Sequence, residues 1–210
     1  KNYFIDKRVP FFVDFAQKFT DLPFLVKLEE RDGAYVAGKH LMASDLGSAD
    51  EGADLKPVLI DGSTGEAAVP NGSLGHRYTD SGMGKWNLDL EGIVPQLTVA
   101  GPALDTDPEQ SVELLVTGFD SVDGTAEVLH RGVPVRKVGG HLVCTIFDLL
   151  LAQYGVVRPG LPGVWPTGFD DATQPYTPAW QEAITGVSAE QVVRVAREMA
   201  DNSEESGGRT

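Results

Sequence analysis

Apolar residues recur at helical spacing near the start of the chain, between Val9 and Phe19. Pro10 suits the first turn of a helix, where a missing N–H costs nothing. Pro23 disfavours helical geometry at the residue before it, so the pattern predicts a short amphipathic helix that ends by Asp21. Its apolar face comprises Phe11, Phe12, Phe15, Ala16 and Phe19.

Two stretches in the first third of the chain predict β-hairpins. Residues 24–30 alternate loosely between apolar and polar, and Arg31-Asp32-Gly33 turns them back into residues 34–36. Residues 56–61 predict a second strand, which returns over residues 66–69 after a turn at 62–65.

A third hairpin is predicted over residues 133–144, with the two-residue turn Gly139-Gly140. Thr145 is placed to cap a following helix, and Gly155 to end it in the left-handed conformation. The expected core stripe of this helix comprises Ile146, Leu149, Leu150 and Tyr154.

Capping signals define two helices near the end of the chain. Thr177-Pro178 opens a short helix that ends at Gly186, and Ser188 with Gln191 forms a capping box for the next. We expect this last helix to fray after Asn202. Its expected buried stripe comprises Val192, Val195, Ala196 and Met199.

Composition narrows the possible functions. The 210 residues have 41% hydrophobic and 23% charged content, as in ordinary globular proteins, and no apolar run approaches the roughly 20 residues of a bilayer span. A formal net charge of -14 argues against nucleic-acid binding, which requires Lys and Arg. Residues 101–127 contain seven acids and no base, which indicates a solvated surface excursion. A cation site is the weaker alternative, because the spacing of a calcium loop is missing.

The chemistry of single residues identifies no site. Cys144 is the only cysteine, which excludes an internal disulfide and a cluster held by several Cys, and its apolar surroundings predict a buried thiol. The glycine-rich residues 72–84 end in Lys85-Trp86, without the hydroxyl of a phosphate loop. Residues 156–174 are rich in Pro and Gly and predict a linker or a surface crossing. No pair of the four histidines has ligand spacing: His40, His76, His130 and His141.

Five blocks of the chain nevertheless resemble, in order, the large catalytic (alpha) subunit of respiratory nitrate reductases, a molybdopterin oxidoreductase family. The first and most informative block reads FTDLPFLVKLEERDG. Gly75-His76-Arg77-Tyr78 departs from the Gly-x-Arg-Trp pattern expected for the family. The blocks are Phe19–Gly33 continued by residues 35–39 and 43–46, Lys56–Ile60 with 69–75, Gly84–Leu88, His141–Gly155, and Pro175–Val187 continued through residue 202.

This resemblance implies an enzyme that reduces nitrate to nitrite at a molybdenum held by two pterin guanine dinucleotides. Electrons would come from quinol through iron–sulfur clusters, including a 4Fe-4S cluster of the alpha subunit itself. The implied partners are an iron–sulfur beta subunit and a membrane cytochrome b gamma subunit, which would hold the complex at the cytoplasmic face of the membrane.

The resemblance transfers no catalytic, cofactor-binding or metal-ligating residue. The family's cluster ligands and molybdenum-binding aspartate lie outside the matched blocks, so Asp21, Asp45 and Asp148 are not assigned to molybdenum. The chain begins at Lys1, and we expect an internal fragment that is inactive alone and binds no cofactor through its own ligands.

The expected fold is mixed α/β, part of a multidomain molybdopterin oxidoreductase. We expect a hairpin-rich region over residues 1–144 and a helical part of the molybdopterin-binding α/β domain over 145–210. Two other functions stay open: another oxyanion reductase of the superfamily, acting on chlorate, perchlorate or selenate, and a non-catalytic acidic interaction module.

Overall fold

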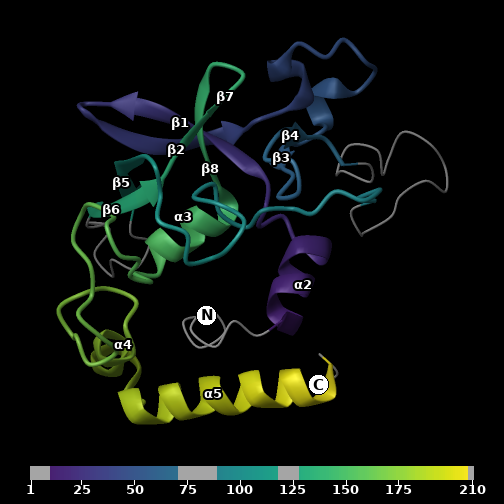
Figure 1. Ribbon diagram of the computed structural model, residues 1–210. Helices are drawn as coiled ribbons and strands as arrows, with labels where there is room; N and C mark the ends of the chain where they lie inside the picture. The colour runs from purple at the N-terminus through teal and green to yellow at the C-terminus, as the bar shows by residue number, and fades with distance from the viewer. Residues whose placement is uncertain (1–9, 71–88, 118–127, 208–210) are drawn as a thin grey trace.

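The structure, a computed structural model, describes residues 10–70, 89–117 and 128–207 (Figure 1). A six-stranded mixed sheet carries most of the core, and three of the four described α-helices follow residue 145. The predicted mixed α/β class, with hairpins first and helices concentrated at the end, is confirmed.

The sheet has the strand order β6-β5-β2-β1-β8-β7. All neighbours are antiparallel except β2 and β5, which run parallel and pair at Tyr35 and Leu114. Two hairpins distant in sequence, β1–β2 and β5–β6, therefore meet at this parallel contact. The strand bounds are β1 Leu25–Arg31, β2 Ala34–His40, β5 Ser111–Thr117, β6 Val128–Pro134, β7 Arg136–Val138 and β8 His141–Thr145.

The first two predicted hairpins are confirmed. Asp32 and Gly33 both have positive φ, 51° and 84°, as a two-residue turn between twisted strands requires. The return strand β2 runs to His40, beyond the predicted residue 36. The second hairpin is shorter than predicted, with only β3 Leu59–Ile60 and β4 Ala67–Ala68. Two 3-10 helices lie between the hairpins, Ala43–Leu46 and Ala53–Leu55.

The prediction of a solvated excursion is wrong for part of the acidic stretch. Strand β5 lies within it and pairs along its whole length with β6. Leu114 and Val116 are buried, whereas Glu113 on the opposite face contacts His130. Buried apolar residues alternate with solvent-facing residues along β5. The many acids around this short strand made the alternation hard to recognise in the sequence. Residues 118–127 lie outside the described part.

The third hairpin is confirmed at its turn and wrong at its start. β7 and β8 are joined by Gly139 and Gly140, as predicted. Val133, however, belongs to β6, and the chain changes strand at Val135, whose N–H donates to the Gln110 carbonyl. The predicted single strand over 133–138 is therefore divided between opposite edges of the sheet.

Helix α3, Ile146–Gln153, begins and ends as predicted, with Thr145 as cap and Gly155 at φ 64°. Its predicted stripe is wrong. Tyr154 is exposed and Leu149 and Leu150 are half-buried, because the helix packs through a face rotated from the predicted one. The buried residues of α3 are Phe147, Asp148, Leu151 and Ala152.

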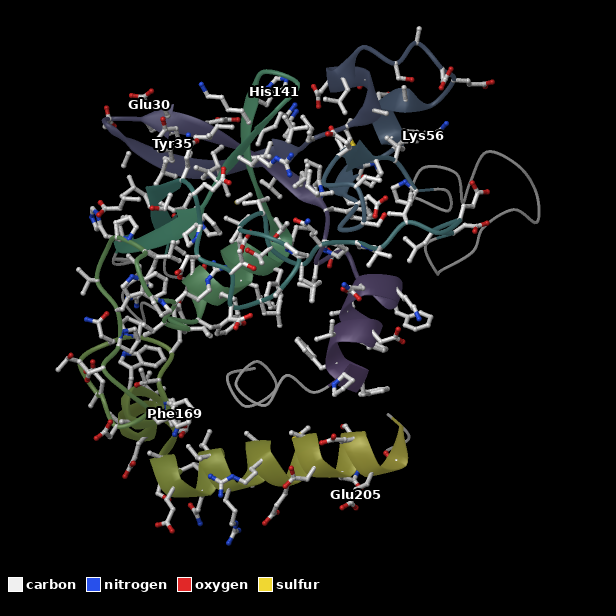
Figure 2. All side chains as sticks on the ribbon, in the orientation of Figure 1. Glu30, Tyr35, Lys56, His141, Phe169 and Glu205 are labelled. Atoms are coloured by element: carbon white, nitrogen blue, oxygen red, sulfur yellow. The ribbon has the colours of Figure 1, made fainter. Side chains whose placement is uncertain are left out.

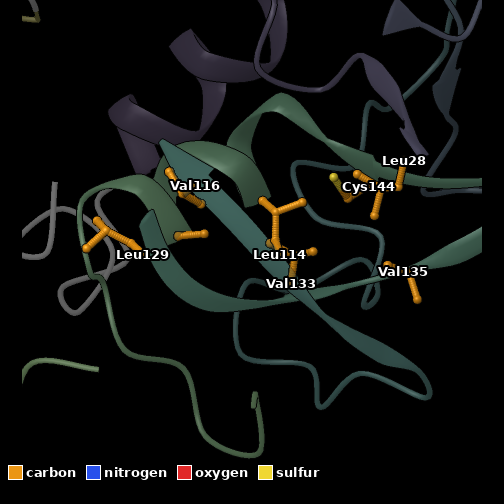
Figure 3. Close-up of a cluster of buried hydrophobic side chains, with 8 residues drawn as sticks. Leu28, Leu114, Val116, Leu129, Val133, Val135 and Cys144 are labelled. Carbon is orange, nitrogen blue, oxygen red and sulfur yellow. The ribbon is translucent and has the colours of Figure 1, made fainter. Parts of the chain in front are cut away.

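The largest part of the core lies between the sheet and α3. Its side chains come from β1, β5, β6 and β8 and from Val135 between β6 and β7, and Ala152 of α3 completes it (Figure 3). A second cluster joins Leu25 and Val143 to the β3 region, and a third packs α2 residues against Phe147 and Leu151. The main cluster comprises Leu28, Leu114, Val116, Leu129, Val133, Val135, Cys144 and Ala152.

The remaining helices have the predicted starts. α2 spans Pro10–Phe19, α4 spans Pro178–Thr185 with Thr177 as its cap, and α5 begins at Ala189 with the predicted capping box. α5 continues to Ser206, so the expected fraying after Asn202 is wrong. Gly207 supplies the left-handed C-cap that the sequence reading overlooked.

The predicted burial of the α5 stripe is also wrong. Val195 and Met199 are exposed, and Ala200 is the one buried residue that the helix contains. Residues 156–174 contain no helix or strand, as predicted for a surface crossing. The predictions for residues 71–88 lie outside the described ranges.

Candidate functional site

The densest polar cluster of the described chain surrounds Asp148. Its carboxylate is fully buried at the first turn of α3. One oxygen accepts from the Thr98 hydroxyl at 2.7 Å and from a guanidinium nitrogen of Arg158 at 2.6 Å. The other accepts from the backbone N–H groups of Val99 at 3.1 Å and Thr145 at 3.3 Å.

This cluster joins three segments that are distant in sequence. Thr145 donates its hydroxyl to the Leu97 carbonyl and accepts from the Asp148 N–H, so the cap of α3 also fixes the 97–99 loop. Arg158, in the crossing after α3, adds the opposite charge. Both carboxylate oxygens are already occupied by donors, which is the arrangement of a structural crosslink.

Asp45 forms a second ion pair, with Lys27. The ammonium lies 2.9 Å from both carboxylate oxygens, and the Met42 N–H donates to one of them at 2.8 Å. The backbone hydrogen bond from Met42, aided by Lys27, lowers the pKa of Asp45 below its ordinary value. This pair attaches the 3-10 turn after β2 to β1.

Asp21 has a simpler role. Its carbonyl accepts from the Phe24 N–H at 3.0 Å in the turn that follows α2, and its side chain is exposed. Asp21, Asp45 and Asp148 therefore lie at three separate places: the turn after α2, the 3-10 helix after β2 and the first turn of α3.

Cys144 is fully buried in β8, as predicted. Burial, together with the nearby charge of Asp148, raises the pKa of the thiol well above its ordinary value. A thiol that resists deprotonation is a poor nucleophile and a poor metal ligand.

The three histidines of the described residues lie on different strands. His40 ends β2, His130 lies in β6 beside Glu113 at 2.6 Å, and His141 begins β8. Figure 2 shows His141 on the β7–β8 hairpin, at the opposite end of the molecule from Glu205 of α5. His76 lies outside the described ranges.

Arg131 is the residue that sequence reasoning missed most clearly. It lies in β6 with 1% of its surface exposed, and its guanidinium carbon is 5.4 Å from the centre of the Trp165 ring. Within the part of the chain that the structure describes, its three guanidinium nitrogens have no hydrogen-bond partner. Burial lowers the pKa of this group, and the nearby Asp171 and Tyr176 oppose that shift. Arg131 follows His130 in a sequence of no recognisable motif, so only the fold reveals its burial.

Two glycines allow the crossing over residues 155–166 to press against β6, and a third allows the crossing to fold on itself. A Cβ on Gly132 would lie 2.5 Å from the Pro162 carbonyl oxygen, and one on Gly163 would lie 2.6 Å from that of His130. Gly155 similarly meets the Pro166 ring at 2.7 Å. The crossing therefore covers Arg131 by direct backbone contact.

The surface hollows reach these groups only at their edges: a small one, of about 100 Å³, is lined in part by Arg158. A larger one, of about 320 Å³, lies where β2 and β5 diverge above α3, and is lined by Val36, Leu115 and Gln153 among others. A second, of about 460 Å³, lies beside β7 and is lined by Glu109, Arg136 and Lys137 among others. Neither contains a nucleophile with a neighbouring base.

The donor chemistry of the described residues does not fit molybdenum or an iron–sulfur cluster. Over residues 10–70, 89–117 and 128–207, no three His, Cys, Asp or Glu side chains are grouped to hold a metal ion. Cys144 is held as a buried thiol, and Asp148 is saturated by donors. We therefore derive no reaction step from these side chains.

Among the described helices, none is both long and apolar enough to cross a membrane.

Comparison with curated proteins gives a consistent set of relatives, whereas no family model matches the chain. The nitrate reductase alpha subunit of Mycobacterium tuberculosis is 54% identical over 209 residues, which cover 99% of this chain and 17% of that protein. The respiratory nitrate reductase 1 alpha chain of Escherichia coli is 38% identical over 228 residues, and the nitrate reductase alpha chain of Bacillus subtilis 36% over 220.

Both alignments include the whole of this chain, which spans 18% of the Escherichia coli relative and 17% of the Bacillus subtilis one. The alignments thus cover the acidic stretch as well as the five blocks. Over its whole length, the chain is homologous to one segment of the nitrate reductase alpha subunits.

Proposed function

We propose that this chain is a scaffold segment of a catalytic alpha subunit that reduces nitrate to nitrite. The observation that supports this proposal is 54% identity to a nitrate reductase alpha subunit across nearly all of the chain. In the reaction, nitrate takes up two electrons and two protons and releases nitrite and water.

The cofactor chemistry is assigned to the rest of the subunit. A molybdenum bis(pterin guanine dinucleotide) centre and a 4Fe-4S cluster would supply the electron transfer, and the described residues of this chain offer them no ligand set. What these residues do is hold the fold. Asp148 and Arg158 connect α3 to the 97–99 loop, and Asp45 and Lys27 connect β1 to the turn after β2.

We further propose a division of the segment at the start of α3. Residues 1–144 would form a hairpin-rich region, and residues 145–210 the helical part of an α/β domain that binds the pterin cofactor elsewhere on its surface. Thr145 ends β8 and caps α3, so its position fits such a boundary.

The complex that this proposal implies contains an iron–sulfur beta subunit and a membrane cytochrome b gamma subunit, which delivers electrons from quinol. The alpha subunit would be held at the cytoplasmic face of the membrane through these partners. The respiratory relative from Escherichia coli supports an assignment to a respiratory complex.

A substrate comparison tests the proposal. The complete alpha subunit that contains this segment, loaded with its cofactors and given a reduced viologen as electron donor, is assayed with nitrate, chlorate, perchlorate and selenate. We expect nitrate to give the highest kcat/KM. A nitrate value far below that of another oxyanion would contradict the proposal, and the 210-residue chain alone serves as the control without turnover.

A further inference from the structure

Most of the apolar stripe of helix α5 is exposed to solvent, with only Val192 half-buried. Met199 is 66% exposed and Val195 47%. These two residues, with Val192 and Ala196, recur at the i, i+3, i+4, i+7 spacing of one helix face. We call these four residues the α5 stripe: Val192, Val195, Ala196 and Met199.

The helix that carries the stripe is firmly built. Ser188 and Gln191 form its capping box, and Gly207 closes its other end in the left-handed conformation. The corner with α4 is fixed by hydrogen bonds from Gln181 to the Val187 carbonyl and from the Ala189 N–H to Glu182, both 2.9 Å. The exposed stripe is therefore not explained by a frayed end.

Little of the described part of this chain packs on α5. Helix α4 is the one described element with which α5 shares a substantial contact, and Figure 1 shows α5 at the far end of the molecule from the β1–β2 hairpin. Amphipathic helices in proteins derive most of their stability from packing of the apolar face. The apolar face of this 18-residue helix is thus expected to pack against another apolar surface.

The charged residues beside the α5 stripe restrict which kind of surface can pack against it. α5 carries five acids and two arginines: Glu190, Glu198, Asp201, Glu204 and Glu205, with Arg194 and Arg197. A second copy would bring the same acidic border and a further net charge of -14, which opposes association. Helices that lie on membranes have polar faces rich in Lys and Arg, unlike this one.

We propose that the α5 stripe is an internal interface of the alpha subunit, covered by an apolar face with a basic border from polypeptide outside this segment. This inference depends on the proposed function insofar as it places the chain in a larger subunit. It is supported by the length of the relatives, because this segment covers only 17–20% of each and the rest is available to supply the cover.

Cysteine labelling at two adjacent positions tests whether the α5 stripe is buried in the complete subunit. Met199→Cys reports on the stripe, and Glu198→Cys is the matched control, because the Glu198 side chain is 68% exposed on the neighbouring polar face. Each variant is made in the complete alpha subunit and in the 210-residue chain. A maleimide is added, and labelling of the α5 peptide is followed by mass spectrometry.

In the complete subunit, we expect position 199 to react at least about tenfold more slowly than position 198, because thiol reactivity depends on access. In the 210-residue chain the two rates should agree within about twofold. Equal labelling of the two positions in the complete subunit would overturn the proposal.

Two further outcomes would also overturn it by naming another occupant. Protection of position 199 in the 210-residue chain that grows with protein concentration would assign the stripe to a second copy. Protection that appears only with phosphatidylglycerol vesicles would assign it to lipid. Nitrate turnover is measured separately, so a protected stripe in a subunit that reduces no nitrate would refute the proposed function and leave this inference standing.

Discussion

A guanidinium nitrogen of Arg158 lies 2.6 Å from the buried carboxylate of Asp148, whereas the guanidinium of Arg131 meets no hydrogen-bond acceptor among the described residues. The two arginines thus make different contributions, although both are largely withdrawn from solvent. Removing one member of a buried ion pair destabilises a protein strongly, because the other charge stays buried without a partner.

We predict that the same substitution destabilises the chain to different extents at these two positions. Arg158→Met should cost about 3–5 kcal/mol of unfolding free energy, because it leaves the Asp148 carboxylate without its cation. Arg131→Met should cost no more than about 1 kcal/mol, the size of the lost contact with Trp165, because it also removes a buried charge whose nitrogens have no hydrogen-bond partner among the described residues. Urea unfolding of both variants measures the difference, and an equal loss would contradict this view of the two sites.

The glycine contacts of the 155–166 crossing give a second prediction. Gly160→Ala should cost about 1–2 kcal/mol, because Gly160 has φ 77° but open space around its Cβ position. Gly163→Ala should cost a further 1–3 kcal/mol or so, because its Cβ would meet the His130 carbonyl oxygen at 2.6 Å. Thermal unfolding of the two variants provides the comparison. Equal costs would show that the crossing does not press on β6.

Acid should weaken the loop that precedes α4. Hydrogen bonds from Thr173, joined by the Thr167 N–H, lower the pKa of Asp171 from 3.8 to about 2. Between these two values the unfolded chain binds more protons than the folded chain, so the contribution of Asp171 is complete above pH 3.8 and is lost as the pH falls towards 2.

Asp171→Ala removes this pH dependence. We expect the stability of the variant to fall less steeply than that of the unmodified chain between pH 4 and 2 or so. Asp170→Ala is the control, since the neighbouring carboxylate makes none of these hydrogen bonds to Thr167 or Thr173. Identical slopes for the Asp171 variant and the unmodified chain would contradict the assignment.

Cys144 should react with thiol reagents only when the chain opens. It is fully buried in β8, and burial raises its pKa. The labelling rate of this single cysteine should therefore be limited by the opening of the native chain. Under native conditions, the rate should reach a plateau as the reagent concentration rises. Fast labelling under native conditions, at the rate seen in urea, would show that β8 is not part of the core.

Local signals made much of the fold predictable. The caps at Thr145, Thr177 and Ser188 and the turn at Gly139-Gly140 depend on residues within a few positions of each other, and the structure confirms them. The Asp148 cluster had a partial signal, because Thr145-x-x-Asp148 is a capping box. Its link to Arg158 could be found only from the fold.

The wrong predictions concern strands and helix faces whose burial depends on tertiary packing. β5 was hidden among carboxylates, and its parallel pairing with β2 joins segments that are almost eighty positions apart. The α5 stripe satisfied every rule for a buried face, yet periodicity states only that a face will be covered and not by which polypeptide. The exposed stripe is thus a failed prediction within this chain and the basis of the inferred interface.

The central claim is that this segment supplies scaffold and no metal ligand. It is tested most directly by the nitrate reduction rate per bound molybdenum in complete alpha subunits carrying Asp21→Asn, Asp45→Asn or Asp148→Asn. We predict a rate per molybdenum within about twofold of the unmodified enzyme, with a lower Tm for the Asp45 and Asp148 variants and an unchanged Tm for Asp21. A variant that keeps its Tm but loses its molybdenum and its nitrate turnover would contradict the claim.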